Sequence, residues 1–141
     1  MILIDGKKLS TKILGVLKQD VALFPTRLRL AAVVVGEDIG IKNFVAQKKK
    51  IADSLGIDFR IYQYEETIAT NKLRKRLAEI VREKKNSAVI IQLPLPEHIH
   101  TQYILNAVTA DKDIDMLSAS ASGDFYVGKS DILPPVVGAI K

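Results

Sequence analysis

Two short, uninterrupted apolar runs constrain the fold of this chain more than any other feature of its sequence. They read LAAVVV at residues 30–35 and AVIIQ at residues 88–92. Continuous apolar runs of this length are typical of strands that are buried on both faces, as in parallel sheets. A further segment, residues 57–64, alternates apolar and polar side chains and also predicts a strand.

Apolar residues at helical spacing fill the intervals between these strands. Residues 71–84 repeat at this spacing, a lysine-bearing segment runs from Gly40 to Gly56, and residues 101–108 predict a short helix. Gly56 sits where a glycine that ends a helix belongs. Strands that alternate with helices predict an α/β fold, a three-layer domain in which helices flank a mostly parallel sheet.

The two ends of the chain are less regular. Residues 1–4 predict a short strand, and residues 116–123 (MLSASASG) predict a loop. Ser10 is a candidate N-cap for a helix whose apolar positions are Ile13, Leu14, Leu17, Val21 and Phe24. Pro134 and Pro135 signal a helix start very close to the last residue. We therefore expect a fragment of a longer protein, cut at or just inside an interdomain helix.

Composition narrows the classes of protein. The chain has no cysteine, which excludes disulfides and thiolate metal sites and fits a reducing compartment such as the cytoplasm. No apolar run reaches the length of a membrane span, and the polar N-terminus is unlike a signal peptide. The net charge of +5 favours anionic partners, either nucleic acid or an acidic small molecule.

Three consecutive lysines, at positions 48 to 50, do not share one helical face. On a helical wheel, Lys50 falls opposite the apolar arc, and Lys42 and Lys49 lie on its flank. Lys48 falls near the middle of that arc, which consists of Ile41, Phe44, Val45, Ile51, Ala52 and Leu55. Either its stem covers apolar surface while its ammonium reaches water, or the lysine faces a cleft and serves acid–base chemistry.

Polar residues follow the second buried strand. Gln92 ends that strand, where open α/β sheets bind ligands, and Pro94 and Pro96 stiffen the backbone after it; the alternative is a strand-end glutamine in solvent. Residues 111–115 (DKDID) have three interpretations. Their carboxylates bind a divalent metal, one carboxylate accepts hydrogen bonds from two N–H groups of a heterocycle, or the segment is a solvated turn. His98 and His100 lack an evident third metal ligand, which predicts surface residues near a helix start.

These elements together resemble the N-terminal, tetrahydrofolate-binding catalytic domain of bifunctional methylenetetrahydrofolate dehydrogenase/methenyltetrahydrofolate cyclohydrolase. The resemblance begins with ILIDGKKLS and covers nearly the whole chain. The family pattern around the catalytic lysine reads FVAQKKK at residues 44–50, QLPLP is intact at residues 92–96, and KDVDG appears as KDIDM at residues 112–116. This resemblance implies a catalytic domain over residues 1–133 and a truncated interdomain helix at residues 134–141.

The resemblance also implies roles for individual residues. Lys48 is the catalytic lysine, which handles the proton as water attacks or leaves the methenyl carbon. Gln92 hydrogen-bonds Lys48 and keeps it oriented, and both, with Pro94, belong to the substrate site. Asp115 binds the pterin ring and is grouped with the catalytic residues. Phe44 takes the place of a tyrosine that stacks on the folate.

The family reaction oxidises 5,10-methylenetetrahydrofolate, usually with NADP, and hydrolyses the methenyl product to 10-formyltetrahydrofolate. The dinucleotide belongs to a C-terminal Rossmann domain, and this chain contains no GxGxxG-like segment. We therefore expect no cofactor and no metal in this chain, and no dehydrogenase activity from it alone. The resemblance implies a reduced-folate substrate, no nucleic-acid or membrane partner, a homodimer for the full-length protein and a monomer for the fragment.

Several positions depart from the family pattern. Phe44 loses the tyrosine hydroxyl, Ile41 replaces a serine, Met116 replaces a glycine, and Ala121 replaces an asparagine. A folate-binding or regulatory module without chemistry is therefore an alternative to the enzyme. A basic nucleic-acid-binding domain is a third hypothesis, although the aromatic residues are not interleaved with the basic runs.

Overall fold

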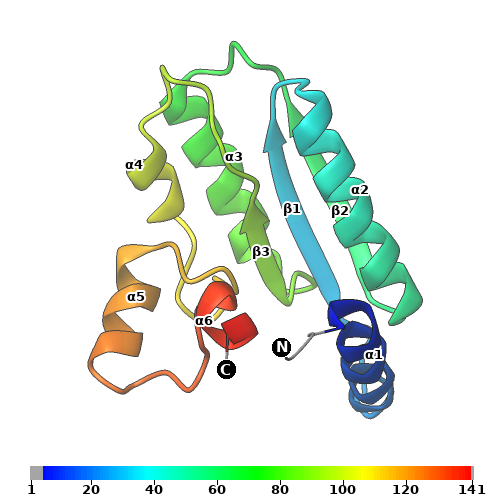
Figure 1. Cartoon of the computed structure of the whole chain (residues 1–141). Helices are drawn as coiled ribbons and strands as arrows, with labels where there is room; N and C mark the ends of the chain where they lie inside the picture. The colour runs from blue at the N-terminus through cyan, green and yellow to red at the C-terminus, as the bar shows by residue number, and fades with distance from the viewer. Residues whose placement is uncertain (1–4, 141) are drawn as a thin grey trace.

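The computed structural model describes residues 5–140, and within them three parallel strands form one sheet (Figure 1). The strands are β1 (Arg29–Val35), β2 (Asp58–Tyr64) and β3 (Ala88–Ile91), in the order β2-β1-β3. The helices are α1 (Gly6–Ala22), α2 (Ile39–Ser54), α3 (Thr70–Arg82), α4 (Thr101–Leu105), α5 (Ala119–Tyr126) and α6 (Pro135–Ile140). This confirms the predicted α/β fold, while the strand predicted at residues 1–4 lies outside the described residues.

The central strand β1 is buried on both faces because helices cover the sheet on either side (Figure 1). Ala32 and Val34 pack with Val45 and Ala52 of α2 on one face. On the other face, side chains of β1 and β3 pack with α3 and α4. This cluster includes Ala31, Val33, Leu73, Leu77, Val89 and Ile104. The alternation of side chains along β1 divides the core into two layers around the sheet, as the prediction of three layers requires.

Two glycines with positive φ reverse the chain at the ends of β1 and α2. Gly36 has φ +83° directly after β1, and its N–H donates to the carbonyl of Tyr64 over 3.0 Å. Gly56 has φ +80° just beyond the helix cap at Leu55, which confirms the predicted glycine stop. Glycine is favoured at both positions because a Cβ atom is strained in this region of φ.

The prediction for the start of the first helix was wrong. Helix α1 begins at Gly6, and the Asp5 side chain caps it by accepting the Lys8 N–H over 3.0 Å. Ser10 lies inside the helix, and Phe24 lies beyond its end at Ala22. The aspartate at position 5 satisfies a free N–H of the first turn, so the helix forms one turn earlier than the serine signal indicated.

The loop predicted at residues 116–123 was also wrong, because α5 begins within it. Ser118 caps this helix by accepting the Ala121 N–H over 3.2 Å. The Ser118 N–H itself donates to the buried Asp113 carboxylate over 2.7 Å. These two bonds fix the first turn of a segment whose small residues tolerate a helix.

Helices α1 and α6 carry no buried residue among those described. Helix α6 begins at Pro135, as the proline signal predicted, whereas its assignment to an interdomain helix stays a prediction. Helix α1 extends away from the sheet (Figure 1). None of the helices described between residues 5 and 140 combines the length and apolar character needed to cross a membrane.

We predict that Leu77→Ala lowers the free energy of unfolding by about 2–5 kcal/mol, because the leucine is fully buried between α3 and the sheet. Leu9→Ala is the matched control: Leu9 is 51% exposed on α1, so a loss of no more than about 0.5 kcal/mol is expected. Urea denaturation measures both. Equal losses in the two variants would contradict the described core.

Candidate functional site

Helix α2 begins at the carboxyl edge of the sheet and brings Lys48 beside the residue that follows β3. The chain leaves β1 through Gly36, and Asp38 caps α2 by accepting the Ile41 N–H over 2.8 Å. The helix then packs against the sheet through Val45 and Ala52. The apolar arc is only partly buried, because Phe44 is 53% exposed and Ile51 is 46% exposed.

The lysine run divides as the helical wheel predicted. Lys48 is half-buried, and its Nζ donates to the Gln92 side-chain oxygen, Oε1, over 3.2 Å. Lys49 instead pairs with Asp53 over 2.9 Å on an exposed flank, and Lys50 is exposed. Lys48 therefore has a polar partner within the protein, which distinguishes it from a lysine that only covers apolar surface.

Gln92 is held from two sides directly after β3. Its backbone N–H donates to the Val33 carbonyl over 2.9 Å, which continues the ladder between β3 and β1. Its side-chain Nε2 donates to the Leu93 carbonyl over 2.8 Å. This bond leaves the side-chain oxygen to accept from Lys48. Gln92 is 9% exposed, so the alternative of a strand-end glutamine in solvent is wrong.

The Phe44 ring lies one helical turn before Lys48 on the same side of α2. The Lys48 Nζ is 5.0 Å from the ring centroid, within the range of a cation–π contact. Because the ring is about half exposed, it offers an apolar face beside the ammonium. A flat heterocycle can stack on such a face.

Asp115 contributes a carboxylate on the same side of the sheet. Burial raises the pKa of Asp115, the positive charge of Lys48 opposes this rise, and the neighbouring Asp113 adds to it. Lys48 of α2 therefore lies close enough to affect the pKa of Asp115, which belongs to the acidic loop, residues 111–115. A half-buried carboxylate with a raised pKa is a frequent feature of ligand sites.

Asp113 and Lys112 anchor the acidic loop, and the sequence analysis assigned neither of them this role. Asp113 is 5% exposed, forms a bridge with Val89, and accepts the Ser118 N–H, so it is not part of a solvated turn. The Lys112 Nζ donates to the carbonyls of Val81 and Glu83 over 2.6 and 3.1 Å. No sequence signal marks this role, because it depends on contacts with Val89, Val81 and Glu83, which lie far from the loop in the sequence.

Pro94 lies beside this group rather than within it. It lines a hollow of about 180 Å³ with Gly36, Asp38, Ile41 and other residues, but Lys48, Gln92 and Asp115 are not in that lining. His98 and His100 are both exposed near the start of α4, as predicted, and His100 caps that helix. The described residues contain no group of three or more His, Cys, Asp or Glu that can hold a metal ion.

The turns after the described strands do not suit a dinucleotide. A pyrophosphate needs a glycine-rich turn and a helix N-terminus without negative charge. After β1, only one glycine, Gly36, precedes Glu37 and Asp38, and Asp38 already caps α2. After β2, Glu65 and Glu66 follow directly. The turns after β1 and β2 therefore do not fit the pyrophosphate of NADP, and no hydride-transfer step is assigned to the described residues.

Comparison with known proteins agrees with this arrangement. The profile of the family described as tetrahydrofolate dehydrogenase/cyclohydrolase, catalytic domain, matches residues 4–115. The chain belongs to this family. Bifunctional protein FolD of Clostridium perfringens (strain SM101 / Type A) is 30% identical over 135 residues, which cover 94% of this chain and 49% of that protein. Bifunctional protein FolD of Acetivibrio thermocellus is 32% identical over 134 residues, with 93% and 47% covered.

Solved structures of the family share the fold described above. The bifunctional enzyme FolD, methylenetetrahydrofolate dehydrogenase/cyclohydrolase, of Campylobacter jejuni superposes with a TM-score of 0.87 at 29% identity, covering 94% of this chain and 48% of that chain. A 5,10-methylenetetrahydrofolate dehydrogenase of the silkworm Bombyx mori gives 0.93 at 26% identity, with 99% and 50% covered. The chain spans about half the length of the curated relatives it matches.

We predict that Asp115→Asn raises the melting temperature at neutral pH by a few degrees. The raised pKa means that the folded protein binds this proton more tightly than the unfolded chain, so ionisation of Asp115 costs stability above its folded pKa. The gain should disappear as the pH falls through that pKa toward the ordinary value of 3.8. Thermal denaturation at several pH values measures it.

Asp111→Asn is the control for this prediction, because Asp111 is exposed in the same loop. It should show no gain that appears with rising pH. A stabilisation of Asp115→Asn that stayed constant across the acid range would contradict the assignment to a buried carboxylate.

Proposed function

We propose that this chain is the folate-binding catalytic half of a methylenetetrahydrofolate dehydrogenase/cyclohydrolase. In the complete protein, 5,10-methylenetetrahydrofolate is oxidised to the methenyl form, which water then converts to 10-formyltetrahydrofolate. The family membership and the names of the C. jejuni and C. perfringens relatives support this proposal. In it, residues 1–133 form the catalytic domain and residues 134–141 begin an interdomain helix.

One observation carries the proposal: the hydrogen bond from the Lys48 Nζ to Gln92 Oε1 joins two segments that are 44 residues apart in the sequence. Gln92 has a fixed amide orientation, so it aims the ammonium at one place on the carboxyl edge of the sheet. A lysine held by a neutral amide, rather than by a carboxylate, remains able to accept or release a proton in a reaction.

In the proposed hydrolysis, Lys48 acts on the water that attacks the methenyl carbon. As a neutral amine it takes a proton from that water, and as an ammonium it returns a proton when the tetrahedral adduct opens. Gln92 keeps the Nζ within reach of the reacting atoms. The half-exposed Phe44 beside the Nζ supplies a stacking face for the folate ring system.

The Asp115 carboxylate is proposed to accept hydrogen bonds from the amino group and the ring N–H of the pterin. Two parallel hydrogen bonds from such a pair to one carboxylate fix both the position and the orientation of the ring. Pro94, which lines a hollow together with Gly36 and Ile41, is proposed to contact the same substrate. Asp115 thus serves the chemistry by holding the methenyl carbon near Lys48.

NADP is proposed to bind outside the described residues, in a separate Rossmann domain of the complete protein, which we propose to be a homodimer. The Trypanosoma brucei dehydrogenase-cyclohydrolase, whose structure is a complex with NADP, shares the fold with this chain at 23% identity. The poor fit of the turns after β1 and β2 to a pyrophosphate agrees with this division.

A folate-binding module without chemistry is the second candidate. Phe44 carries no hydroxyl, and Ile41 places an apolar side chain at the start of α2 where the family pattern has a serine. Both changes leave a binding surface while removing polar groups. The two candidates differ in whether Lys48 accelerates hydrolysis.

We predict that this chain binds a stable reduced-folate analogue and that Asp115→Ala weakens binding at least about tenfold, because each charge-assisted hydrogen bond contributes about 1.5–3 kcal/mol. Isothermal titration calorimetry measures the affinity. Asp111→Ala removes an exposed carboxylate from the same loop and should change the affinity less than twofold. Loss of affinity in both variants, or in neither, would contradict the pterin role of Asp115.

We also predict that Lys48→Met slows hydrolysis of 5,10-methenyltetrahydrofolate at least about 100-fold, the usual contribution of a general acid–base. The loss of methenyl absorbance measures the rate. Lys50→Met is the matched control, because Lys50 is exposed on the opposite face of α2. A parent chain that binds folate but hydrolyses it no faster than Lys48→Met would favour the module over the enzyme.

A further inference from the structure

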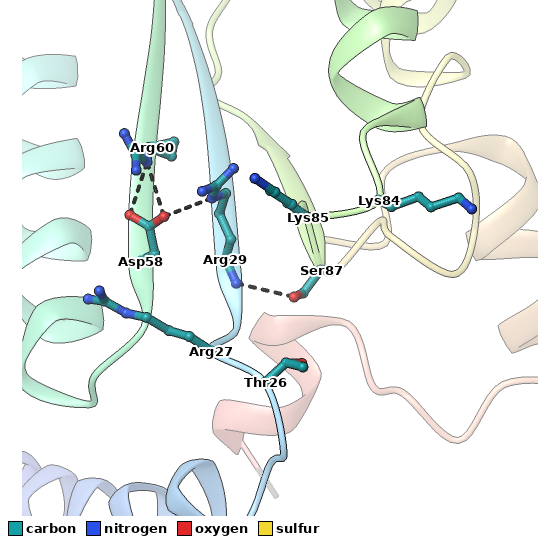
Figure 2. A pocket seen from close by; sticks show the side chains of 8 residues that line it. All are labelled: Thr26, Arg27, Arg29, Asp58, Arg60, Lys84, Lys85 and Ser87. Carbon is teal, nitrogen blue, oxygen red and sulfur yellow. Dashed lines mark hydrogen bonds and ion pairs between the residues drawn. The ribbon is translucent and has the colours of Figure 1, made fainter.

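A second hollow lies at the opposite, amino edge of the sheet, where β1 and β2 begin and where the chain enters β3 (Figure 2). Its volume is about 510 Å³, within the size range of small-molecule sites. Strand β1 has seven residues, so roughly 20 Å of strand separates this hollow from the carboxyl edge that carries Lys48. The two sites therefore share no residue.

Cationic side chains dominate the lining of this hollow. Of the eight described residues that line it, five carry a positive charge and one carries a negative charge. The cations are Arg27, Arg29, Arg60, Lys84 and Lys85, and the carboxylate is Asp58. Glu83 pairs with Arg29 from outside this lining. The whole chain has a net charge of only +5, so much of its excess positive charge is concentrated in this one hollow.

Three arginines are held in the same manner, each through its Nε atom. Arg29 and Arg60 donate from Nε to Asp58 over 2.7 and 3.0 Å, and Arg27 donates to the Gly56 carbonyl over 3.1 Å. Arg29 also donates from one terminal nitrogen to Glu83 over 3.0 Å. Because a guanidinium has five N–H groups, these bonds still leave most of the terminal N–H groups to bind a ligand. Side chains fixed in this way lose little further entropy when a ligand binds.

Asp58 orients these arginines without neutralising all of the lining. Its hydrogen bond with Arg29 raises the pKa of the arginine, while the same bond lowers the pKa of Asp58. Both groups therefore stay charged around neutral pH. Figure 2 shows the Asp58 carboxylate between Arg29 and Arg60, with Lys85 directed toward the Arg29 side.

The remaining lining indicates recognition by charge and hydrogen bonds. Among the described residues, no aromatic ring and no large apolar side chain lines it, so these residues offer a nucleobase no stacking surface. The Ser87 hydroxyl accepts the backbone N–H of Arg29 over 3.2 Å and keeps its own hydrogen to donate. Guanidinium groups suit tetrahedral oxyanions through paired hydrogen bonds, and lysines add charge without fixed geometry.

We propose that this hollow is a binding site for a small, multiply charged phosphate compound, such as a diphosphate. The ligand bridges the terminal N–H groups of Arg27, Arg29 and Arg60, with Lys85 and Ser87 completing its contacts. This site is independent of the folate site, so its failure would leave the proposed enzymatic function unaffected.

Isothermal titration calorimetry with inorganic pyrophosphate tests the proposal on the full chain. The parent should bind, and added sodium chloride should weaken the binding, since the contacts are ionic. Arg60→Gln/Lys85→Gln should lower the affinity at least tenfold. The control Lys12→Gln/Lys75→Gln removes the same charge from two exposed lysines outside this lining and should change the affinity less than twofold.

Arg27→Gln is a second test that does not disturb the Asp58 pairs, and it should also weaken binding at least threefold. Circular dichroism and melting temperature verify that each variant folds. The absence of pyrophosphate binding by the parent, or equal losses in the site and control variants, would overturn the proposal. Citrate that binds as tightly as pyrophosphate would overturn the preference for phosphate.

Discussion

The burial of β1 on both faces is the constraint on which the rest of the structure depends. After Arg29 its side chains are all apolar and mostly buried, so one helical layer must cover each face of the sheet. The parallel neighbours β2 and β3 need crossover helices, and these helices supply both layers. Arg29 fixes the amino ends by pairing with Asp58 of β2 and with Glu83 after α3.

The common direction of the strands separates two chemically different edges. At the carboxyl edge, Lys48 of α2 meets Gln92 after β3, and Asp115 lies close enough for Lys48 to influence its pKa. At the amino edge, arginines gather around Asp58. The carboxyl edge carries a half-buried lysine and a half-buried carboxylate that are not joined by a direct ion pair within the described residues, which leaves both available to a ligand.

Much of this arrangement follows from local sequence patterns. The apolar runs predicted β1 and β3 within a residue at each end, and the wheel separated Lys48 from Lys50 before any tertiary contact was known. The start of α1 was missed because two capping signals, Asp5 and Ser10, compete there. Helix α5 was missed because its first turn depends on Asp113, a buried partner five residues away from Ser118.

The sequence by itself determined the α/β class, the alternation of strands and helices from β1 to α4, the side of α2 on which Lys48 lies, and, through the QLPLP and KDID segments, the family. The family resemblance implied the hydrogen bond between Lys48 and Gln92, and the structure contains it. Only the tertiary structure decided that Asp113 is an anchor and that the arginines of β1 and β2 share one hollow. The reason is physical: periodicity records which face a side chain takes within its own element, whereas the packing of elements decides which faces meet.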